Sequence, residues 1–422
     1  MTRGGAGPRV LVVATKCPWP PTDGGRLVLE QTLLSLAAAG ARITLVSPPP
    51  VAATSRGTGV EPCPVDGPPA AASREDPVIE QIHVARRLRP WATTLTRPAT
   101  PATLVRQTDA RTLAAVERLV AERAFDVAHA EQLHALPLLE PARRRGVPVV
   151  LRAQNVESDL WSGAARAMPL AAPWLLLQAA LLRRFEGRAV AGAAATAALT
   201  APDAARLRAL SNSRGNVVHL PAPFPAALPA GAALPGDPAL VLAGGGWIPN
   251  RDGARWFVGE VWPLVRERLA DARLHVFGVA GGGRTPAMPA GAVAYAAPRE
   301  SIDLFPANAI HVVPLRVASG VRMKILEAWA RGVLVVTTRE AASGLEEGAG
   351  TALLEGTGAL DMAEAIAALH RDPAGARRLV DAGRRLLARH HDPAAIAERW
   401  LELYATISAD RGAAVRDRRS TS

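Results

Sequence analysis

Short, fully apolar segments alternate along the chain with longer segments in which apolar residues recur every three or four positions. In the first half, the apolar segments include 10–14, 43–47, 127–129 and 149–151, and helical periodicity covers 27–39 and 111–123. Fully apolar runs of this length are typical of parallel strands covered on both faces. The pattern predicts an α/β fold with right-handed crossovers between parallel strands.

The alternation stops at a proline-rich block and then restarts. The block PAPFPAALPAGAALPGDP occupies 221–238, and repeated proline can continue neither a helix nor a central strand. Beyond it, ALVLAGG, RLHVFG, AIHVVPL and VLVVTT predict strands, and 253–269, 322–331 and 361–370 predict helices. A chain of 422 residues is too long for one ordinary core, so we expect two Rossmann-like doubly wound domains.

These signals set expected boundaries. We expect an N-terminal domain over 1–222, a linker over 223–238, a C-terminal domain over 239–392, a helix over 393–409 that packs back across the domains, and a basic tail over 410–422. The Pro/Gly-rich stretch 48–71 predicts a long loop. Ligands of doubly wound sheets bind beyond the carboxyl ends of the strands, so the site is expected in a cleft between the domains.

The charge narrows the choice of partners. A formal net charge of +11 favours anions such as nucleic acid, phospholipid or a phosphorylated small molecule, although solubility and codon bias also account for it. The chain has no basic block with interleaved aromatic residues and no recognisable nucleic-acid module, which argues against nucleic-acid binding. Two cysteines, Cys17 and Cys63, make no disulfide framework, so we expect a cytoplasmic protein.

One segment raises the question of a membrane. MPLAAPWLLLQAALL, residues 168–182, is apolar but contains two prolines and is shorter than the roughly 20 residues that span a bilayer. The basic sequence RRFEGR follows it directly, which leaves peripheral membrane contact open as an alternative. The sequence does not determine the oligomeric state.

The segment SGVRMKILEA, residues 319–328, is the strongest candidate for chemistry. It follows a predicted strand and opens a predicted helix near Val321, whose N-terminal N–H groups and dipole favour an anion. Arg322 and Lys324 oppose that dipole unless an anion joins them, and such local conflicts tend to mark function. Glu327 follows Lys324 by three residues, so it either forms a helix-surface ion pair or accepts hydroxyl groups.

Three further segments place polar groups or glycines at the carboxyl ends of predicted strands. In PWPPTDGGR, Gly24 and Gly25 allow close approach of a ligand or make an ordinary tight turn. AQNVESDLW places Gln154 after a buried strand, before an acidic helix start. In LAGGGWIPNRDGARWF, Gly246 lies in a turn that could bind an anion through backbone amides, and Asn250 or Asp252 is expected to cap the next helix.

Other chemistries are not indicated. His129 and His134 lack metal-ligand spacing, no cysteine pair lies near them, and we expect no metal site. The chain contains neither a G-x-S-x-G motif nor a P-loop.

Taken together, these segments resemble those of family-four glycosyltransferases with the GT-B fold, and the resemblance covers nearly the whole chain. PWPPTDGGR, AQNVESDLW, GGGWIPNRDGARWF and above all VVPLRVASGVRMKILEAWARGVLVVTT carry it. It implies a nucleotide-sugar donor held mainly by the second domain, an acceptor held mainly by the first, retention of anomeric configuration and no required metal or other cofactor. Natural products and cell-surface glycans are the acceptors that we consider.

The resemblance also implies residue roles. Arg322 and Lys324 would hold the diphosphate, Glu327 the ribose hydroxyls, and the backbone around Pro298–Glu300 the base. The remaining donor-side positions, with Gln154 as a catalytic-side residue, are Gly24, Gly25, Gly246, Asn250, Ser319, Gly320 and Val321.

Two positions depart from the family pattern. Ser319 stands where the family often has a glutamate, and Gln154 stands where it often has a histidine. A shorter, neutral Ser319 favours a donor sugar that lacks or replaces one hydroxyl, or else an ordinary hexose held through neighbouring backbone. The alternatives to a transferase are a non-catalytic sugar-nucleotide or glycan-binding relative and a nucleotide-sugar 2-epimerase.

Overall fold

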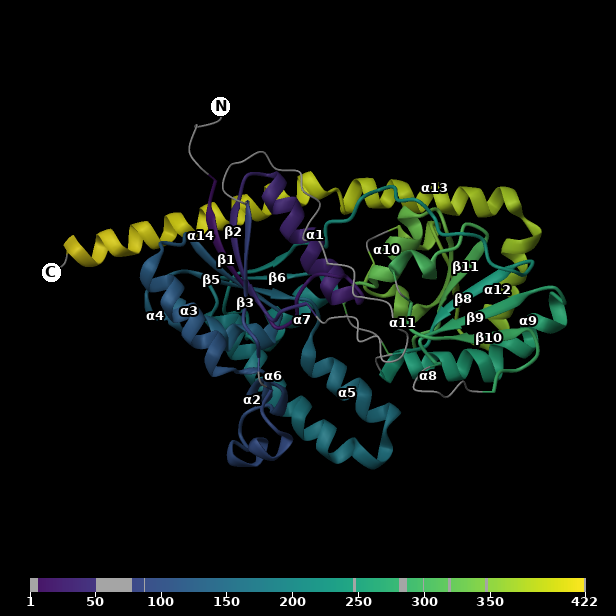
Figure 1. The fold of residues 1–422 in the computed structure, drawn as a ribbon, viewed down its shortest axis with the longest axis horizontal. Helices are drawn as coiled ribbons and strands as arrows, with labels where there is room; N and C mark the ends of the chain where they lie inside the picture. Colours follow the sequence, from purple (N-terminus) through teal and green to yellow (C-terminus); the bar gives the residue numbers. More distant parts are fainter. Residues whose placement is uncertain are drawn as a thin grey trace, which may run out of the picture.

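The computed structural model describes residues 7–50, 78–86, 88–245, 248–280, 287–298, 300–317, 320–345 and 348–420. Two sheets lie side by side, each built only of parallel strand pairs and each enclosed by helices (Figure 1). The first has the strand order β3-β2-β1-β4-β5-β6-β7 and the second β10-β9-β8-β11-β12-β13. The predicted fold class, two doubly wound α/β domains, is confirmed.

The first sheet lies between two layers of helices. Leu29 and Leu33 of α1 pack with Trp400 of α14 against one face, and Val116 of α3 packs with Leu182 of α6 against the other. Its strands are β1 (Arg9–Ala14), β2 (Arg42–Ser47), β3 (Ile79–His83), β4 (Val127–Glu131), β5 (Val149–Ala153), β6 (Ala195–Ala198) and β7 (Val217–His219). Its helices are α1 (Gly24–Ala38), η1 (Trp91–Thr96), α2 (Ala102–Gln107), α3 (Ala110–Glu122), η2 (Leu133–Leu139), α4 (Glu140–Arg144), α5 (Glu157–Ala167), η3 (Pro169–Ala171), α6 (Ala172–Gly192) and α7 (Ala201–Leu210).

The second sheet is enclosed in the same way. Leu326 of α10 and Leu387 of α13 cover one face, and Trp262 of α9 and Ile366 of α12 cover the other. Its strands are β8 (Ala239–Ala243), β9 (Arg273–Phe277), β10 (Ala292–Tyr295), β11 (Ala309–Val313), β12 (Leu334–Thr338) and β13 (Leu354–Gly356). Its helices are α8 (Ile248–Trp256), η4 (Phe257–Val261), α9 (Trp262–Arg268), η5 (Ser301–Leu304), α10 (Met323–Ala330), α11 (Arg339–Ala342), η6 (Ala349–Thr351), α12 (Ala359–Arg371) and α13 (Pro373–His390).

The strand orders explain where each domain can bind a ligand. In the first sheet the chain order reverses between β1 and β4, and in the second between β8 and β11. Ligands of open parallel sheets bind beyond the carboxyl ends of the strands at this reversal. The loops that follow β1, β4, β8 and β11 are therefore the first places to examine.

The helix predicted over 253–269 differs from the structure in its start and in its continuity. α8 begins at Ile248, so Asn250 and Asp252 lie inside the helix, and the prediction that one of them caps it is wrong. Phe257–Val261 forms a π-helical stretch before α9. Pro249 suits a first helical turn, because its missing N–H is not needed there.

The proline-rich segment between the sheets packs on the second domain. Phe224 is buried in that domain's core. The Leu228 N–H donates to the Ala330 carbonyl at 2.9 Å, and the Gly231 N–H donates to the Phe305 carbonyl at 2.8 Å. The segment predicted as a linker therefore follows the surface of the second domain closely.

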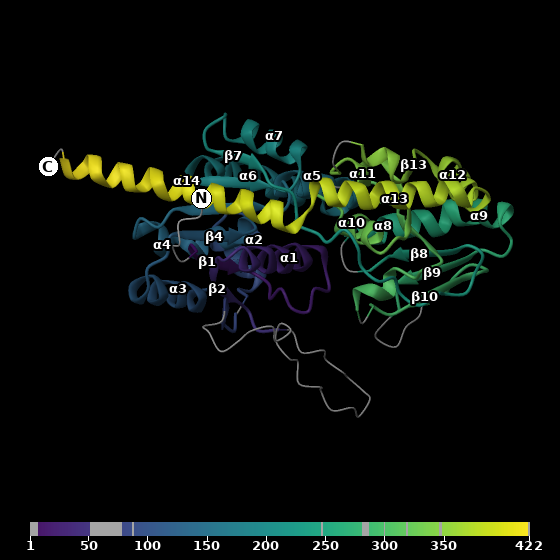
Figure 2. The same ribbon diagram turned by 90° about the horizontal axis from the view of Figure 1, so that it is seen from above.

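The last helix returns to the first domain. α13 runs along the second domain, and α14 (Pro393–Ser420) continues in nearly the same direction across the first sheet (Figures 1 and 2). Trp400 and Tyr404 are 0% and 1% exposed there. The helix extends to Ser420, beyond residue 410, where we expected a tail to begin. In the described part of the chain, no helix has the length and apolarity needed to cross a bilayer.

We expect Trp400→Ala to lower the free energy of unfolding by about 3–5 kcal/mol, because it empties a large, fully buried site between α14 and the first sheet. Urea unfolding measures this loss. Leu360→Ala is the control, since Leu360 is 50% exposed and its truncation should change stability by about 0.5 kcal/mol or less. A loss in Trp400→Ala no larger than in the control would show that α14 contributes little to the first domain.

Candidate active site

The loop after β1 leads into the N-terminus of α1. Asp23 caps this helix, and its carboxylate accepts from the Arg26 N–H at 3.1 Å. The same carboxylate lies 3.1 Å from Lys16 Nζ and 3.2 Å from Arg26 Nε. Burial opposes ionisation of Asp23, but Lys16 and Arg26 hold its pKa below the usual value. The cap thus places two cations beside the positive end of α1.

The two glycines that begin α1 allow close contacts on both sides. A Cβ on Gly24 would lie 3.5 Å from the Met323 side chain, so the first turn of α1 meets the first turn of α10 from the other domain. A Cβ on Gly25 would lie 2.8 Å from Gln154 Oε1, closer than real Cβ contacts. Both glycines therefore lie in close contact with other parts of the protein, and the predicted approach of a ligand to them stays a prediction.

Gln154, which directly follows β5, is held by hydrogen bonds to neighbouring residues. Its Nε2 donates to the Gly25 carbonyl at 3.1 Å and to Glu131 Oε1 at 2.6 Å, and its Oε1 accepts from Gln132 Nε2 at 2.7 Å. Glu131 is 2% exposed at the end of β4. The Gln154 amide is therefore fixed in orientation at the carboxyl edge of the first sheet.

A buried polar network continues from Glu131 toward α14. His129 Nε2 lies 3.2 Å from Glu131 Oε2, and His129 Nδ1 lies 2.7 Å from the Tyr404 hydroxyl. Arg152, which is 0% exposed, lies 3.9 Å from Glu131 and stacks 5.1 Å from the Trp400 ring. Burial lowers the pKa of Arg152 and raises that of Tyr404. α14 therefore packs over His129 and Arg152, which neighbour Glu131, and Glu131 in turn holds Gln154.

In the second domain, Arg322 and Lys324 open α10 as the sequence predicted. Arg322 is the N-cap residue, and its guanidinium donates to the Gly320 carbonyl at 3.0 Å. Its Nε is buried and has no hydrogen-bond partner among the described residues. Desolvation lowers the pKa of Arg322 to about 10 and that of Lys324 to about 8. Within the described residues, the Lys324 ammonium group makes no ion pair and no hydrogen bond. The helix N-terminus and both cations therefore form a site suited to an anion.

Gly320 brings the two domains into contact. Its φ is +74°, and a Cβ there would lie 2.4 Å from the Gln154 carbonyl oxygen and 2.5 Å from Asn155 Oδ1. A glycine is needed both for the backbone angle and for the space. The start of α10 consequently lies against the carboxyl edge of the first sheet. The side chain of Val321, by contrast, is buried in the second-domain core.

Glu327 is 3% exposed, and its partners do not include Lys324, which the sequence spacing suggested. Its ion pair is with Arg331, at 2.9 Å and i+4, and not with Lys324 at i+3. The Ser301 hydroxyl lies 2.6 Å from both carboxylate oxygens. Sequence reasoning missed Ser301, because a single serine in a loop has no pattern that marks it.

Of the remaining positions predicted to contact a donor, those in the described residues have structural contacts of their own. Asn250 Nδ2 donates to the Gly245 carbonyl at 3.3 Å and so braces the turn after β8. Glu300 caps η5 in a capping box with Asp303. Pro298 lies in the loop after β10. Gly246 and Ser319 lie outside the described residues.

Lysine usage is a signal that the sequence reasoning missed. The chain contains 49 Lys and Arg residues together, of which only Lys16 and Lys324 are lysines. Both lie at the domain junction, beside the N-termini of α1 and α10. The electrostatic field of Lys16 also reaches Glu157, at the start of α5, whose pKa is raised to about 7 mainly by burial. A carboxyl group that titrates near neutrality therefore lies near Lys16.

Two arrangements bear on what the site could hold. In the described ranges, no three His, Cys, Asp or Glu side chains gather as a metal site. Cationic groups are instead concentrated where the N-termini of α1 and α10 meet, and both helix dipoles add positive potential there. This geometry suits a diphosphate.

Residues 237–372 match the glycosyl transferases group 1 family. No curated protein sequence is significantly similar to the chain. Among solved structures, sucrose-phosphate synthase from Thermosynechococcus elongatus is similar with a TM-score of 0.70 at 16% identity, over 96% of this chain and 100% of that one. Anabaena HepE in complex with UDP-glucose gives 0.56 at 13%, over 95% and 100%, and Burkholderia multivorans trehalose 6-phosphate synthase gives 0.57 at 15%, over 96% and 99%.

These similarities define the fold. The two facing Rossmann-like domains form the GT-B fold over nearly the full chain. Within it, residues 237–372, which include Arg322, Lys324 and Glu327, match the glycosyl transferases group 1 family.

We expect Gly320→Ala to lower the free energy of unfolding by about 1–3 kcal/mol, because a non-glycine residue is strained at positive φ. The added methyl group would also push α10 away from Gln154. Chemical denaturation measures the first effect. Gly192→Ala is the matched control, since a Cβ there meets nothing within 4 Å. Equal stability of the two variants would show that the junction tolerates a side chain at 320.

Proposed function

We propose that the protein transfers a sugar from a nucleoside-diphosphate sugar to an acceptor. One observation carries the proposal: desolvated Arg322 and Lys324 lie at the start of α10, which faces the start of α1 from the other domain. Two partly buried cations at a helix N-terminus are stabilised when an anion joins them. A diphosphate supplies that anion, and the remainder of a donor supplies the sugar.

The proposed chemistry is stabilisation of a leaving group. As the bond between sugar and β-phosphate breaks, negative charge grows on the phosphate oxygens. Arg322, Lys324 and the N–H groups at the start of α10 would stabilise this charge without reorganising. We propose that Arg322 and Lys324 are catalytic in this sense.

The other donor-side roles follow the family resemblance. Glu327 would accept hydrogen bonds from the ribose hydroxyls. Ser301 and Arg331 donate to its carboxylate and so hold it in one orientation before the donor binds. The backbone around Pro298–Glu300 would frame the base. Anabaena HepE, which shares the fold, is solved with UDP-glucose, and for this reason a UDP-sugar is the first donor to test.

The acceptor is proposed to bind at the carboxyl edge of the first sheet, near Gln154 and Lys16. The fixed Gln154 amide would hydrogen-bond a sugar or acceptor hydroxyl at the junction. We propose retention of anomeric configuration, with the leaving phosphate taking the acceptor's proton. The configuration of the product, read by proton NMR, tests retention separately from transfer.

The direct test is a panel of UDP, GDP, dTDP and ADP sugars with wild type and Lys324→Ala. We expect one donor to be turned over and Lys324→Ala to lower kcat roughly 10²–10³-fold, as loss of a charge-stabilising donor does. Thermal unfolding checks that the variant remains folded. Nucleotide binding without release of product would indicate a non-catalytic sugar-nucleotide-binding protein. Near wild-type turnover by Lys324→Ala would show that Lys324 does not hold the diphosphate.

The lowered pKa of Lys324 makes nucleotide affinity depend on pH. Its folded value of about 8 lies below the ordinary 10.5, so the ligand-free protein loses this charge as pH rises through 8. A diphosphate prefers the protonated form, and affinity should fall by up to about tenfold per pH unit above 8. Calorimetric titration with the nucleoside diphosphate at pH 7 and at pH 9 measures it.

Lys324→Arg is the matched variant for this experiment, because a guanidinium stays charged through this range. It should bind with nearly the same affinity at both pH values. A pH dependence as steep in Lys324→Arg as in wild type would assign the titrating group elsewhere.

We propose that no divalent metal is required, because Arg322 and Lys324 occupy the position at which a metal would neutralise the diphosphate. Turnover should therefore persist in excess EDTA, measured by release of nucleoside diphosphate. Loss of turnover that Mn²⁺ or Mg²⁺ restores would contradict this part of the proposal and leave the transfer itself intact.

A further inference from the structure

The hairpin formed by α5 and α6 exposes apolar side chains at its tip. Met168 and Leu170 lie between the two helices, 38% and 103% exposed, and Trp174, Leu176 and Leu177 in the first turns of α6 are 42%, 52% and 55% exposed. Figure 1 shows the hairpin extending below the junction of the two domains, with its tip away from both sheets. Such a cluster of large exposed apolar residues marks an interaction surface.

Farther along the same helix, the exposed face becomes cationic. Arg183 and Arg184 follow Leu176 and Leu177 by seven residues each, which returns them to the same side of α6 after about two turns. Both are exposed, as is Arg188 one turn beyond. The outer face of α6 is therefore apolar near the tip and basic above it.

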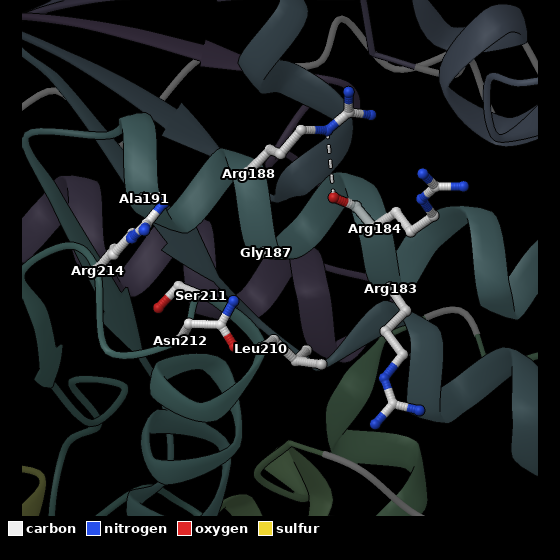
Figure 3. Close-up of a pocket in the computed structure, with 9 residues that line it drawn as sticks. All are labelled: Arg183, Arg184, Gly187, Arg188, Ala191, Leu210, Ser211, Asn212 and Arg214. Carbon is white, nitrogen blue, oxygen red and sulfur yellow. Dashed lines mark hydrogen bonds between the residues drawn. The ribbon is translucent and has the colours of Figure 1, made fainter.

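These arginines line a depression of about 300 Å³ between α6 and the turn after α7. Arg214 and Asn212 come from that turn and lie across from the α6 side chains (Figure 3). The turn approaches closely because Gly187 has no side chain: a Cβ there would lie 2.4 Å from the Leu210 carbonyl oxygen. None of the described residues that line the depression is acidic.

The acidic residues near α6 are engaged elsewhere. Glu186, on α6 itself, is 1% exposed and accepts from the Glu157 and Ser158 N–H groups at 2.6 and 3.0 Å. Asp159 is paired with Arg206, which borders an adjoining part of the depression, at 2.9 Å. The α6 arginines thus present their positive charge outward.

We propose that the α5–α6 hairpin docks the protein onto an anionic lipid bilayer. Interfacial segments insert apolar side chains roughly 5–10 Å below the headgroups and keep Arg at the headgroup level. Seven residues of helix separate the leucines from the arginines by about 10 Å, so insertion of the tip places Arg183 and Arg184 at the lipid phosphates. The depression that includes Arg188 and Arg214 then receives a phosphate headgroup.

The test is flotation of the full chain with vesicles of phosphatidylcholine, alone or mixed with phosphatidylglycerol. We expect binding only to the mixed vesicles, weakening as salt is raised. Arg183→Gln with Arg184→Gln should lower partitioning roughly 30-fold, and Leu170→Ser with Leu177→Ser roughly tenfold or more per leucine. Thermal unfolding confirms that each variant is folded.

Matched controls lie on other surfaces. Arg377→Gln with Arg385→Gln removes the same charge from the exposed face of α13. Leu360→Ser removes from α12 a leucine that is 50% exposed, close to the 55% of Leu177. Neither should change partitioning more than a few-fold. If the two α13 substitutions lower partitioning as much as the two α6 substitutions do, net charge alone adsorbs the protein to the vesicles. The proposal would then fail.

Two other outcomes would also overturn it. One is absence of wild-type binding to the mixed vesicles at low salt. The other is thermal stabilisation of the wild type by inorganic phosphate, lost in the variant with Arg183→Gln and Arg184→Gln, when no vesicle binding is seen. That result would assign the depression to a soluble phosphate. Flotation does not depend on sugar transfer, so its result is separate from the proposed enzymatic activity.

Discussion

The contact between Gly320 and the carbonyl of Gln154 is the constraint on which the site depends. A side chain at 320 has no room, since a Cβ would lie 2.4 Å from that oxygen. With glycine there, the N-terminus of α10 lies against the carboxyl edge of the first sheet, and Gly24 of α1 packs on Met323. Two helix N-termini from different domains consequently point to one place. Positive potential from both dipoles adds there, before any side chain is considered.

Desolvation lowers the pKa values of the cations at this junction. Removing Lys324 from water lowers its pKa toward neutrality, and Arg322 nearby disfavours its charge further. Such an arrangement is unfavourable for the empty protein and favourable once a dianion is present. The restriction of lysine to Lys16 and Lys324 in a chain otherwise rich in arginine fits this interpretation. A lysine's pKa shifts readily on burial, whereas an arginine remains charged.

The first domain contributes a fixed surface to the same junction, and the end of the chain helps to hold it. α14 closes over Glu131, His129 and Arg152, and Glu131 in turn orients the Gln154 amide. A buried charged group is tolerated only when it is paired, so loss of α14 would expose or unpair this network. The helix that joins the two domains therefore also supports the acceptor side of the proposed site.

The sequence by itself determined the two-domain α/β architecture, because central parallel strands need continuous apolar runs and proline interrupts them. It also located Arg322 and Lys324, whose charge conflicts with a helix N-terminus. It missed β3, β7, β10 and β13, which lie at or near the sheet edges and have mostly half-buried residues, and β6, whose four residues are only Ala and Thr. Only the tertiary structure joined Glu327 to Ser301, Gln154 to Glu131, and Arg183 to the turn at Arg214. These pairs are distant in sequence, and polar partners leave no periodic signal, since their energy depends on three-dimensional proximity alone.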